Sequence, residues 1–191
     1  MQILANRHID KRIFLDLIGL RNRDITDARL TRFLDRLNPD DILKHIRIPH
    51  FVVSKSDNGN NPNARPTSKS GPNPHQPLEP PNNCKIVFKH LKTVKAILHI
   101  SIDDLSGKRA PHTNKAIISC LEHFRDNIEQ WDWKKIDICS DTILEAAPKA
   151  RDIYLYSSGN NAVLKSWSAP DGLLRFTCVG PIPLGTNRKV N

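Results

Sequence analysis

The stretch Val94-Lys-Ala-Ile-Leu-His-Ile-Ser-Ile102 decides the predicted fold. Every second residue from Val94 to Ile102 is apolar, and Ile97 and His99 lie on the opposite parity. In an extended strand, successive side chains point to opposite faces of the sheet. Apolar residues on both parities are typical of a strand whose sheet is covered on both sides. We therefore expect a buried strand here, within an α/β domain.

Comparable apolar stretches recur along the chain at intervals of roughly twenty to thirty residues, around Ile100, Trp131, Leu155 and Phe176. Further strands are expected at residues 12–18, 46–53, 128–133, 151–156 and 173–179. Helices are expected from capping residues and apolar spacing. They are placed after Asp24 or Thr26, from Asp40-Asp41 to His45, after Thr113 or Asn114, from Thr142 to Ala147, and from Ala162 to Trp167.

A helix in each interval between strands predicts an α/β fold of strand-helix repeats with a mostly parallel sheet. Two arrangements fit this spacing. One is an irregular stack of the leucine-rich-repeat type, and the other is an open doubly wound sheet. The stack is the favoured interpretation.

The domain organisation follows from shifts in composition. Residues 1–53 are expected to be the N-terminal strand-helix segment of the α/β domain. Residues 54–83 are rich in Asn, Pro, Ser and Gly, which predicts a disordered loop or linker because little there can be buried. Residues 84–180 are the main repeat-like region, and residues 181–191 are expected to be a flexible tail.

The charge balance suggests a nucleic-acid partner, but its distribution does not favour one. The 191 residues include 29 basic and 20 acidic ones, for a formal net charge of +9. The basic residues are scattered among acids, and no aromatics alternate with them as a base-stacking surface requires. Nucleic-acid binding therefore stays an alternative, and a protein partner is preferred.

The sequence also predicts a cellular compartment. No stretch approaches the roughly 20 apolar residues that cross a bilayer. Charged residues interrupt the first eleven positions, where a signal peptide needs an apolar run. The four cysteines are widely spaced within apolar patterns, which predicts buried thiols. We expect an intracellular protein, cytoplasmic or nuclear, without a membrane partner.

Candidate chemistry is sparse. Ser157 or Ser158, with His112 and either Asp103 or Asp104, would be the residues of a serine hydrolase, but no Gly-x-Ser-x-Gly turn surrounds the serines. Acids at a strand end are typical of a solvated turn. Cys120, His123 and Cys139 lack the two tight ligand pairs of structural zinc, and no glycine-rich phosphate loop is present. No catalytic, metal or cofactor-binding residue is assigned, and the tryptophans are interpreted as core.

Several motifs occur in a fixed order. They are Ile100-Ser-Ile-Asp-Asp-Leu105, Pro111-His112, Trp131-Asp-Trp-Lys-Lys-Ile-Asp-Ile138, Ala146-Ala-Pro148, Leu155-Tyr-Ser-Ser-Gly-Asn-Asn-Ala-Val-Leu164, Trp167-Ser168 and Asp171-Gly-Leu173. Together they resemble the region that precedes the peptidase domain in large intracellular fungal proteins with subtilisin-like serine peptidase domains. The resemblance covers residues 85–174 and extends more weakly to 14–19, 40–43 and 48–49.

The resemblance implies an accessory role. In that family the Asp, His and Ser motifs of the peptidase lie in a later domain, so no catalytic residue is carried over, and this sequence looks like a truncated or separately encoded copy. The resemblance marks nine residues without giving them a role: Asp103, Asp104, Trp131, Asp132, Trp133, Ser158, Gly159, Asn160 and Trp167. We expect a non-catalytic module that binds a protein, and peptidase-related hydrolase activity is a second alternative.

Overall fold

The computed structural model describes residues 14–36, 42–54, 82–105, 110–176 and 184–186. It has the predicted α/β fold, with a five-stranded parallel sheet in the order β1-β3-β5-β6-β7. These strands are β1 (Phe14–Asp16), β3 (Ile42–Ile48), β5 (Ala96–Asp103), β6 (Gln130–Lys134) and β7 (Asp152–Ile153).

Two small parallel sheets accompany the main one. β2 (Asp24–Thr26) pairs with β4 (Val52–Ser54), and β8 (Leu155–Ser157) pairs with β9 (Leu184–Thr186). The α-helices are α1 (Asp27–Asp35), α2 (Asn83–His90), α3 (Asn114–Leu121), α4 (Ser140–Ala146) and α5 (Asn161–Ser168). Three short 3-10 helices are η1 (Ile18–Leu20), η2 (Leu91–Thr93) and η3 (Leu173–Arg175).

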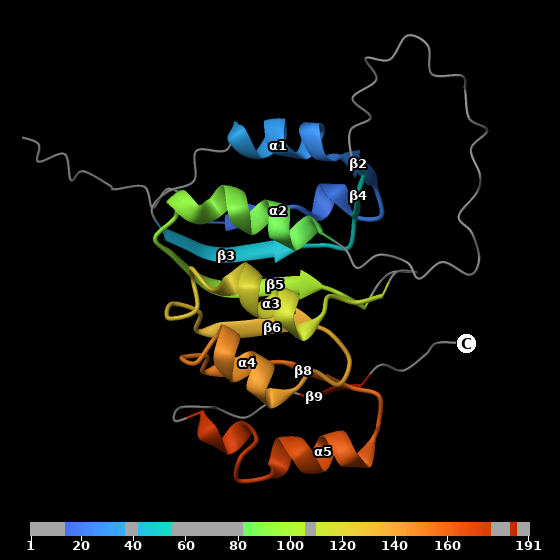
Figure 1. Ribbon diagram of the computed structural model, residues 1–191, viewed down its shortest axis with the longest axis vertical. Helices are drawn as coiled ribbons and strands as arrows, with labels where there is room; N and C mark the ends of the chain where they lie inside the picture. Colours follow the sequence, from blue (N-terminus) through green and yellow to red (C-terminus); the bar gives the residue numbers. More distant parts are fainter. Residues whose placement is uncertain (1–13, 37–41, 55–81, 106–109, 177–183, 187–191) are drawn as a thin grey trace, which may run out of the picture.

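The main sheet is built as a one-sided stack. Its strands lie side by side in the order in which the chain makes them, and each of the helices α1 to α4 contacts the next. Figure 1 shows α2, α3 and α4 in front of the strands, with α1 above α2 at the top of the view. Right-handed crossovers that always step in the same direction keep their helices on one face. The arrangement is that of a strand-helix stack.

The helix-facing side of the sheet holds the core. One row of residues in register consists of Leu15, Ile46, Ile100, Trp131 and Ile153, all of them buried. The next such row includes Ile48, Ile102 and Trp133. The rings of Trp131 and Trp133 stack with centroids 5.9 Å apart. The interpretation of the tryptophans as core is confirmed, since Trp167 is also buried.

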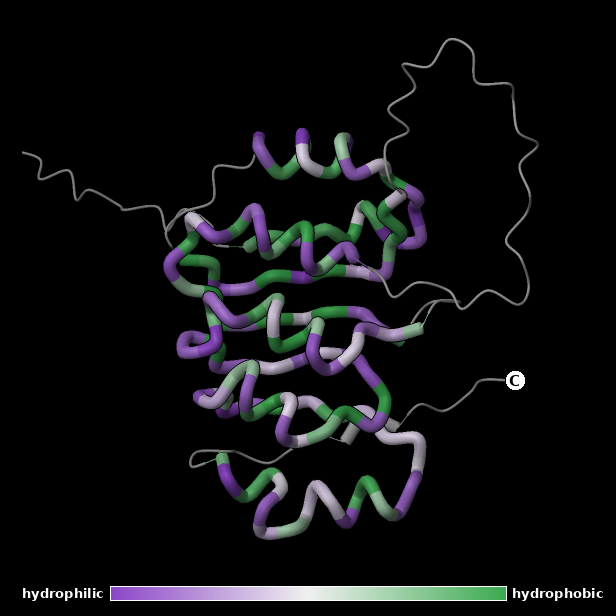
Figure 2. The backbone as a smooth tube through the Cα atoms, in the orientation of Figure 1, coloured by the Kyte–Doolittle hydropathy of each residue, from purple (hydrophilic) through white to green (hydrophobic). Residues whose placement is uncertain are grey.

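The opposite side of the sheet differs from the prediction. Alternation along the strands gives it Asp16, Arg47, Asp132 and Lys134, which stay exposed or partly exposed. Figure 2 shows the polar and apolar residues alternating along β3. The expectation of a sheet covered on both faces is therefore wrong for these strands. We call this side the open face.

Local predictions were confirmed at several helices. Thr26 caps α1 by accepting the backbone N–H of Arg29, and Thr113 caps α3 in the same way. The helix predicted at residues 162–167 lies within α5, which Asn160 caps, and Leu30 and Leu34 are the buried residues of α1. Short polar side chains satisfy backbone donors that a helix start leaves free.

Other local predictions were wrong. Residues 42–45 belong to β3 and not to a short helix, because pairing with β1 and β5 suits the isoleucine-rich alternation. Residues 173–175 form η3 instead of a strand. Helix α4 begins at Ser140, so Thr142 is not its cap.

The predicted linker and tail lie mostly outside the described residues. At the linker's margins, Ser54 ends β4 and Asn83 begins α2, a helix that the sequence did not predict. Within the predicted tail, Leu184–Thr186 form β9.

Candidate functional site

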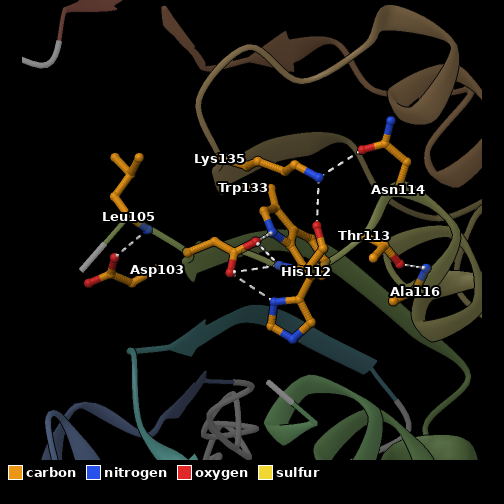
Figure 3. A network of polar contacts seen from close by, with 9 residues as sticks. Asp103, Leu105, His112, Thr113, Asn114, Ala116, Trp133 and Lys135 are labelled. Atoms are coloured by element: carbon orange, nitrogen blue, oxygen red, sulfur yellow. Dashed lines mark hydrogen bonds and ion pairs between the residues drawn. The ribbon is translucent and has the colours of Figure 1, made fainter. Parts of the chain in front are cut away.

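Asp104 and His112 form a buried pair just beyond the end of β5 (Figure 3). Nδ1 of His112 lies 2.9 Å from Oδ1 of Asp104, and each side chain is only 3% exposed. The backbone N–H of His112 also donates to the carboxylate, 3.0 Å from Oδ2. The pair thus holds the residue before the cap of α3 against the end of β5, which confirms the predicted helix start.

Two further side chains complete this network. Nε1 of Trp133 donates to Oδ2 of Asp104 over 3.0 Å. Nζ of Lys135 donates to the carbonyl oxygen of His112 and to Oδ1 of Asn114, 2.8 Å away. Burial lowers the pKa of Lys135, and the charge of Asp104 opposes that shift. The network joins β5, β6 and the start of α3 beyond the carboxyl ends of these two parallel strands.

The pair resembles two thirds of a hydrolytic triad, because a carboxylate orients an imidazole through Nδ1. Nε2 of His112 is buried and has no hydrogen-bond partner among the described residues. Neither candidate serine reaches it. Oγ of Ser158 donates to Oδ2 of Asp137, and Oγ of Ser157 accepts the backbone N–H of Gly159.

Asp103 has a different environment from its neighbour. It forms an ion pair with Arg21 over 3.4 Å and accepts the backbone N–H of Leu105. Its side chain is 10% exposed, and that of Asp104 is 3% exposed. The prediction that these acids form a solvated turn is therefore wrong. The burial arises from pairing with residues distant in sequence, which strand-end composition does not reveal.

The open face centres on Asp132. Its Oδ2 accepts from Oγ of Ser101 at 2.8 Å, and its Oδ1 accepts from the hydroxyl of Tyr156 at 2.7 Å. Nζ of Lys134 lies 4.0 Å from the same carboxylate. Burial and the adjacent Asp132 raise the pKa of Tyr156, so its hydroxyl stays a donor. These polar groups are held in place before any partner arrives.

Aromatic and charged groups continue the open face toward β1. Phe14, which is 62% exposed, lies 6.1 Å from the ring of His45, and that ring lies 6.3 Å from the ring of His99. Arg47 and Asp16 form an ion pair over 3.5 Å, with about half of each side chain exposed. Burial, followed by Arg47 and His99, lowers the pKa of His45.

The remaining marked residues are structural in their contacts. Nε1 of Trp167 donates to the carbonyl oxygen of Ile138 over 2.8 Å. Gly159 has a φ of +87°, which glycine adopts without strain, in a turn that joins β8 to the cap residue Asn160. Ser158 closes that turn onto Asp137. The interpretation of Ser157-Ser158-Gly159 as a turn after a strand is confirmed.

The possible metal ligands are dispersed. Nε2 of His123 lies 3.2 Å from the carbonyl oxygen of Val94, and Sγ of Cys139 faces Asp141. Burial raises the pKa of Cys120 to about 11. Across residues 14–36, 42–54, 82–105 and 110–176, no three His, Cys, Asp or Glu side chains are arranged to hold a metal ion.

The residues of these networks that the sequence did not single out include Lys135, Ser101, Tyr156 and Arg47. His99 and Ser101 are two residues apart in β5, so they lie on the same face of the sheet, and Arg47 lies beside Ser101 in the neighbouring strand β3. This polar alternation is the signal that could have indicated the open face.

Comparison with protein-family models, with curated proteins and with solved structures finds no match for this chain. The resemblance to fungal proteins with subtilisin-like peptidase domains therefore stays a prediction. Separately, no helix in the described part of the chain is long and apolar enough to cross a membrane.

Proposed function

We propose that the chain is a non-catalytic module that binds a protein through the open face of its sheet. The observation that carries this proposal is the row of mutually paired polar residues on that face, most of them partly exposed. Asp132 is bonded by Ser101 and Tyr156, and Arg47 is paired with Asp16. Side chains that are already ordered lose less conformational entropy on binding, which favours association.

The chemistry of the face suits a protein surface. Arg and aromatic residues are enriched in protein interfaces, and Arg47 and Phe14 on the open face supply both kinds. Stacked parallel strands also present a continuous surface, which repeat proteins use for binding. The resemblance suggests a subtilisin-like peptidase domain as the partner to test.

The test is equilibrium binding of the purified chain to a recombinant fungal subtilisin-like peptidase domain. Arg47→Glu reverses a charge on the open face and is expected to weaken binding at least tenfold. The matched control Arg125→Glu reverses an exposed charge beyond α3 and is expected to stay within twofold of the native chain. Absent binding, or equal effects of the two variants, would refute the proposal.

A second measurement separates binding from hydrolysis. A fluorophosphonate probe labels activated serines. We expect no labelling, because Oγ of Ser158 donates to Asp137 and Oγ of Ser157 accepts the backbone N–H of Gly159. Labelling of the native chain that disappears in Ser157→Ala or Ser158→Ala would establish the hydrolase alternative instead. Binding to mixed DNA that falls steeply with salt would favour the nucleic-acid alternative.

A further inference from the structure

The charged side chains that line a groove between α2 and α3 are mostly positive. The volume of the groove is about 800 Å³. Lys85, Lys89, Lys92 and Lys115 line it, and Glu122 is the only acid among the described residues that do so. All four lysines are exposed. The groove lies on the helical layer, so it is distinct from the open face of the sheet.

The charges are arranged along a line. Lys85 and Lys89 lie one turn apart on α2, and Lys92 follows on η2. At 1.5 Å per helical residue, the positions from 85 to 92 extend over roughly 10 Å. Lysines spread in this way do not converge on one phosphate group. They match several carboxylates carried along a peptide.

The start of α3 adds to the positive potential. Thr113 and Lys115 line the groove there, and the N-terminus of a helix favours anions. The partly buried Lys135 donates to the carbonyl oxygen of His112 immediately behind it. These groups place further positive charge beside the lysines of α2.

A buried, unpartnered nitrogen lies at the same wall. His112 lines the groove, is 2% exposed as a residue, and has no hydrogen-bond partner for Nε2 among the described residues. Nε2 lies across the ring from Nδ1, the nitrogen that contacts Asp104. An unsatisfied buried polar atom is costly, so a ligand group that reaches it gains affinity. Phe88, Ala116 and Cys120 supply an apolar floor.

We infer that this groove binds an acidic, amphipathic segment of a protein partner. Carboxylates of the segment pair with the lysines, and its apolar side chains lie on the floor of the groove. The inference rests on the proposed function only in taking the partner to be a protein. It concerns a second surface, so its failure can be told apart from failure of the open face.

The probe is a fluorescent twelve-residue peptide with glutamate and leucine at helical spacing, measured by anisotropy at low salt. Lys85→Glu with Lys89→Glu is expected to weaken binding at least tenfold. Lys149→Glu with Lys165→Glu makes the same change in net charge at exposed positions outside the groove, and is expected to stay within twofold. The Arg47→Glu variant is also expected to bind the peptide normally.

Four outcomes would overturn the inference. The first is no binding of the peptide to the native chain. The second is equal weakening by both lysine pairs, which would indicate a general charge effect. The third is undiminished binding when glutamine replaces every glutamate of the peptide. A single-stranded oligonucleotide that competes for the groove more strongly than the peptide would likewise reject a protein ligand.

Discussion

Asp104 should contribute more to stability than any exposed carboxylate, since it is almost fully buried and accepts three hydrogen bonds. The donors are the backbone N–H and Nδ1 of His112 and Nε1 of Trp133, at 2.9 to 3.0 Å. In Asp104→Ala these donors lose their acceptor, and each buried donor left unsatisfied costs about 1–3 kcal/mol. Relaxation and entering water reduce the sum, so we expect a loss of about 3–5 kcal/mol.

The assay is urea unfolding followed by tryptophan fluorescence, because Trp131, Trp133 and Trp167 are all buried. The control Asp35→Ala removes a carboxylate that is 60% exposed and pairs only with the half-buried His90 in the described contacts. It is expected to cost less than about 1 kcal/mol. If Asp104→Ala prevents folding, Asp104→Asn keeps one acceptor oxygen and should lie between the two. Equal losses for Asp104→Ala and Asp35→Ala would refute the role given to this network.

Three other predictions follow from single residues. The free energy of unfolding should fall as pH drops below about 6.5, because the pKa of His45 is lowered in the folded state and the unfolded state therefore binds the proton first. His45→Gln should flatten that part of the plot of unfolding free energy against pH, and an unchanged plot would contradict this. Cys120 has a pKa of about 11, so its alkylation by iodoacetamide, mapped by mass spectrometry, should rise about tenfold per pH unit from 8 to 10; a rate that levels off near pH 8 would contradict the shift. Gly159→Ala should destabilise the chain by about 1 kcal/mol because φ is +87°, whereas Gly19→Ala, with open space around its Cβ position and no positive φ, should have a smaller effect in the same urea assay.

The fold was largely predictable because the periodicity of apolar residues along the sequence indicates which side chains are buried. The apolar parity of Val94 to Ile102 predicted β5, and the pair Trp131 and Trp133 predicted a buried face of β6. The same stretch also led to the wrong prediction that the opposite face of the sheet is covered. Ile97 is buried, whereas the partly exposed His99 and the small, buried Ser101 on its parity belong to the open face.

The candidate site was less predictable, since it depends on contacts between distant residues. Asp104 and His112 were both singled out, but their pairing depends on where the chain returns to form α3. Lys135 acts through the carbonyl of His112, 23 positions away. Lys85 and Lys89 of the groove recur at helical spacing. Because α2 itself was not predicted, that spacing could not be recognised as one face of a helix.

The most direct test of the open face uses diethylpyrocarbonate, which modifies accessible histidines, with and without the peptidase domain. His99 lies on the open face, and His90 lies at the end of α2 with 26% of its side chain exposed. We predict that the complex protects His99 and leaves His90 as reactive as in the free chain. Protection of His90 with His99 unchanged, or no protection at either histidine, would contradict binding through the open face.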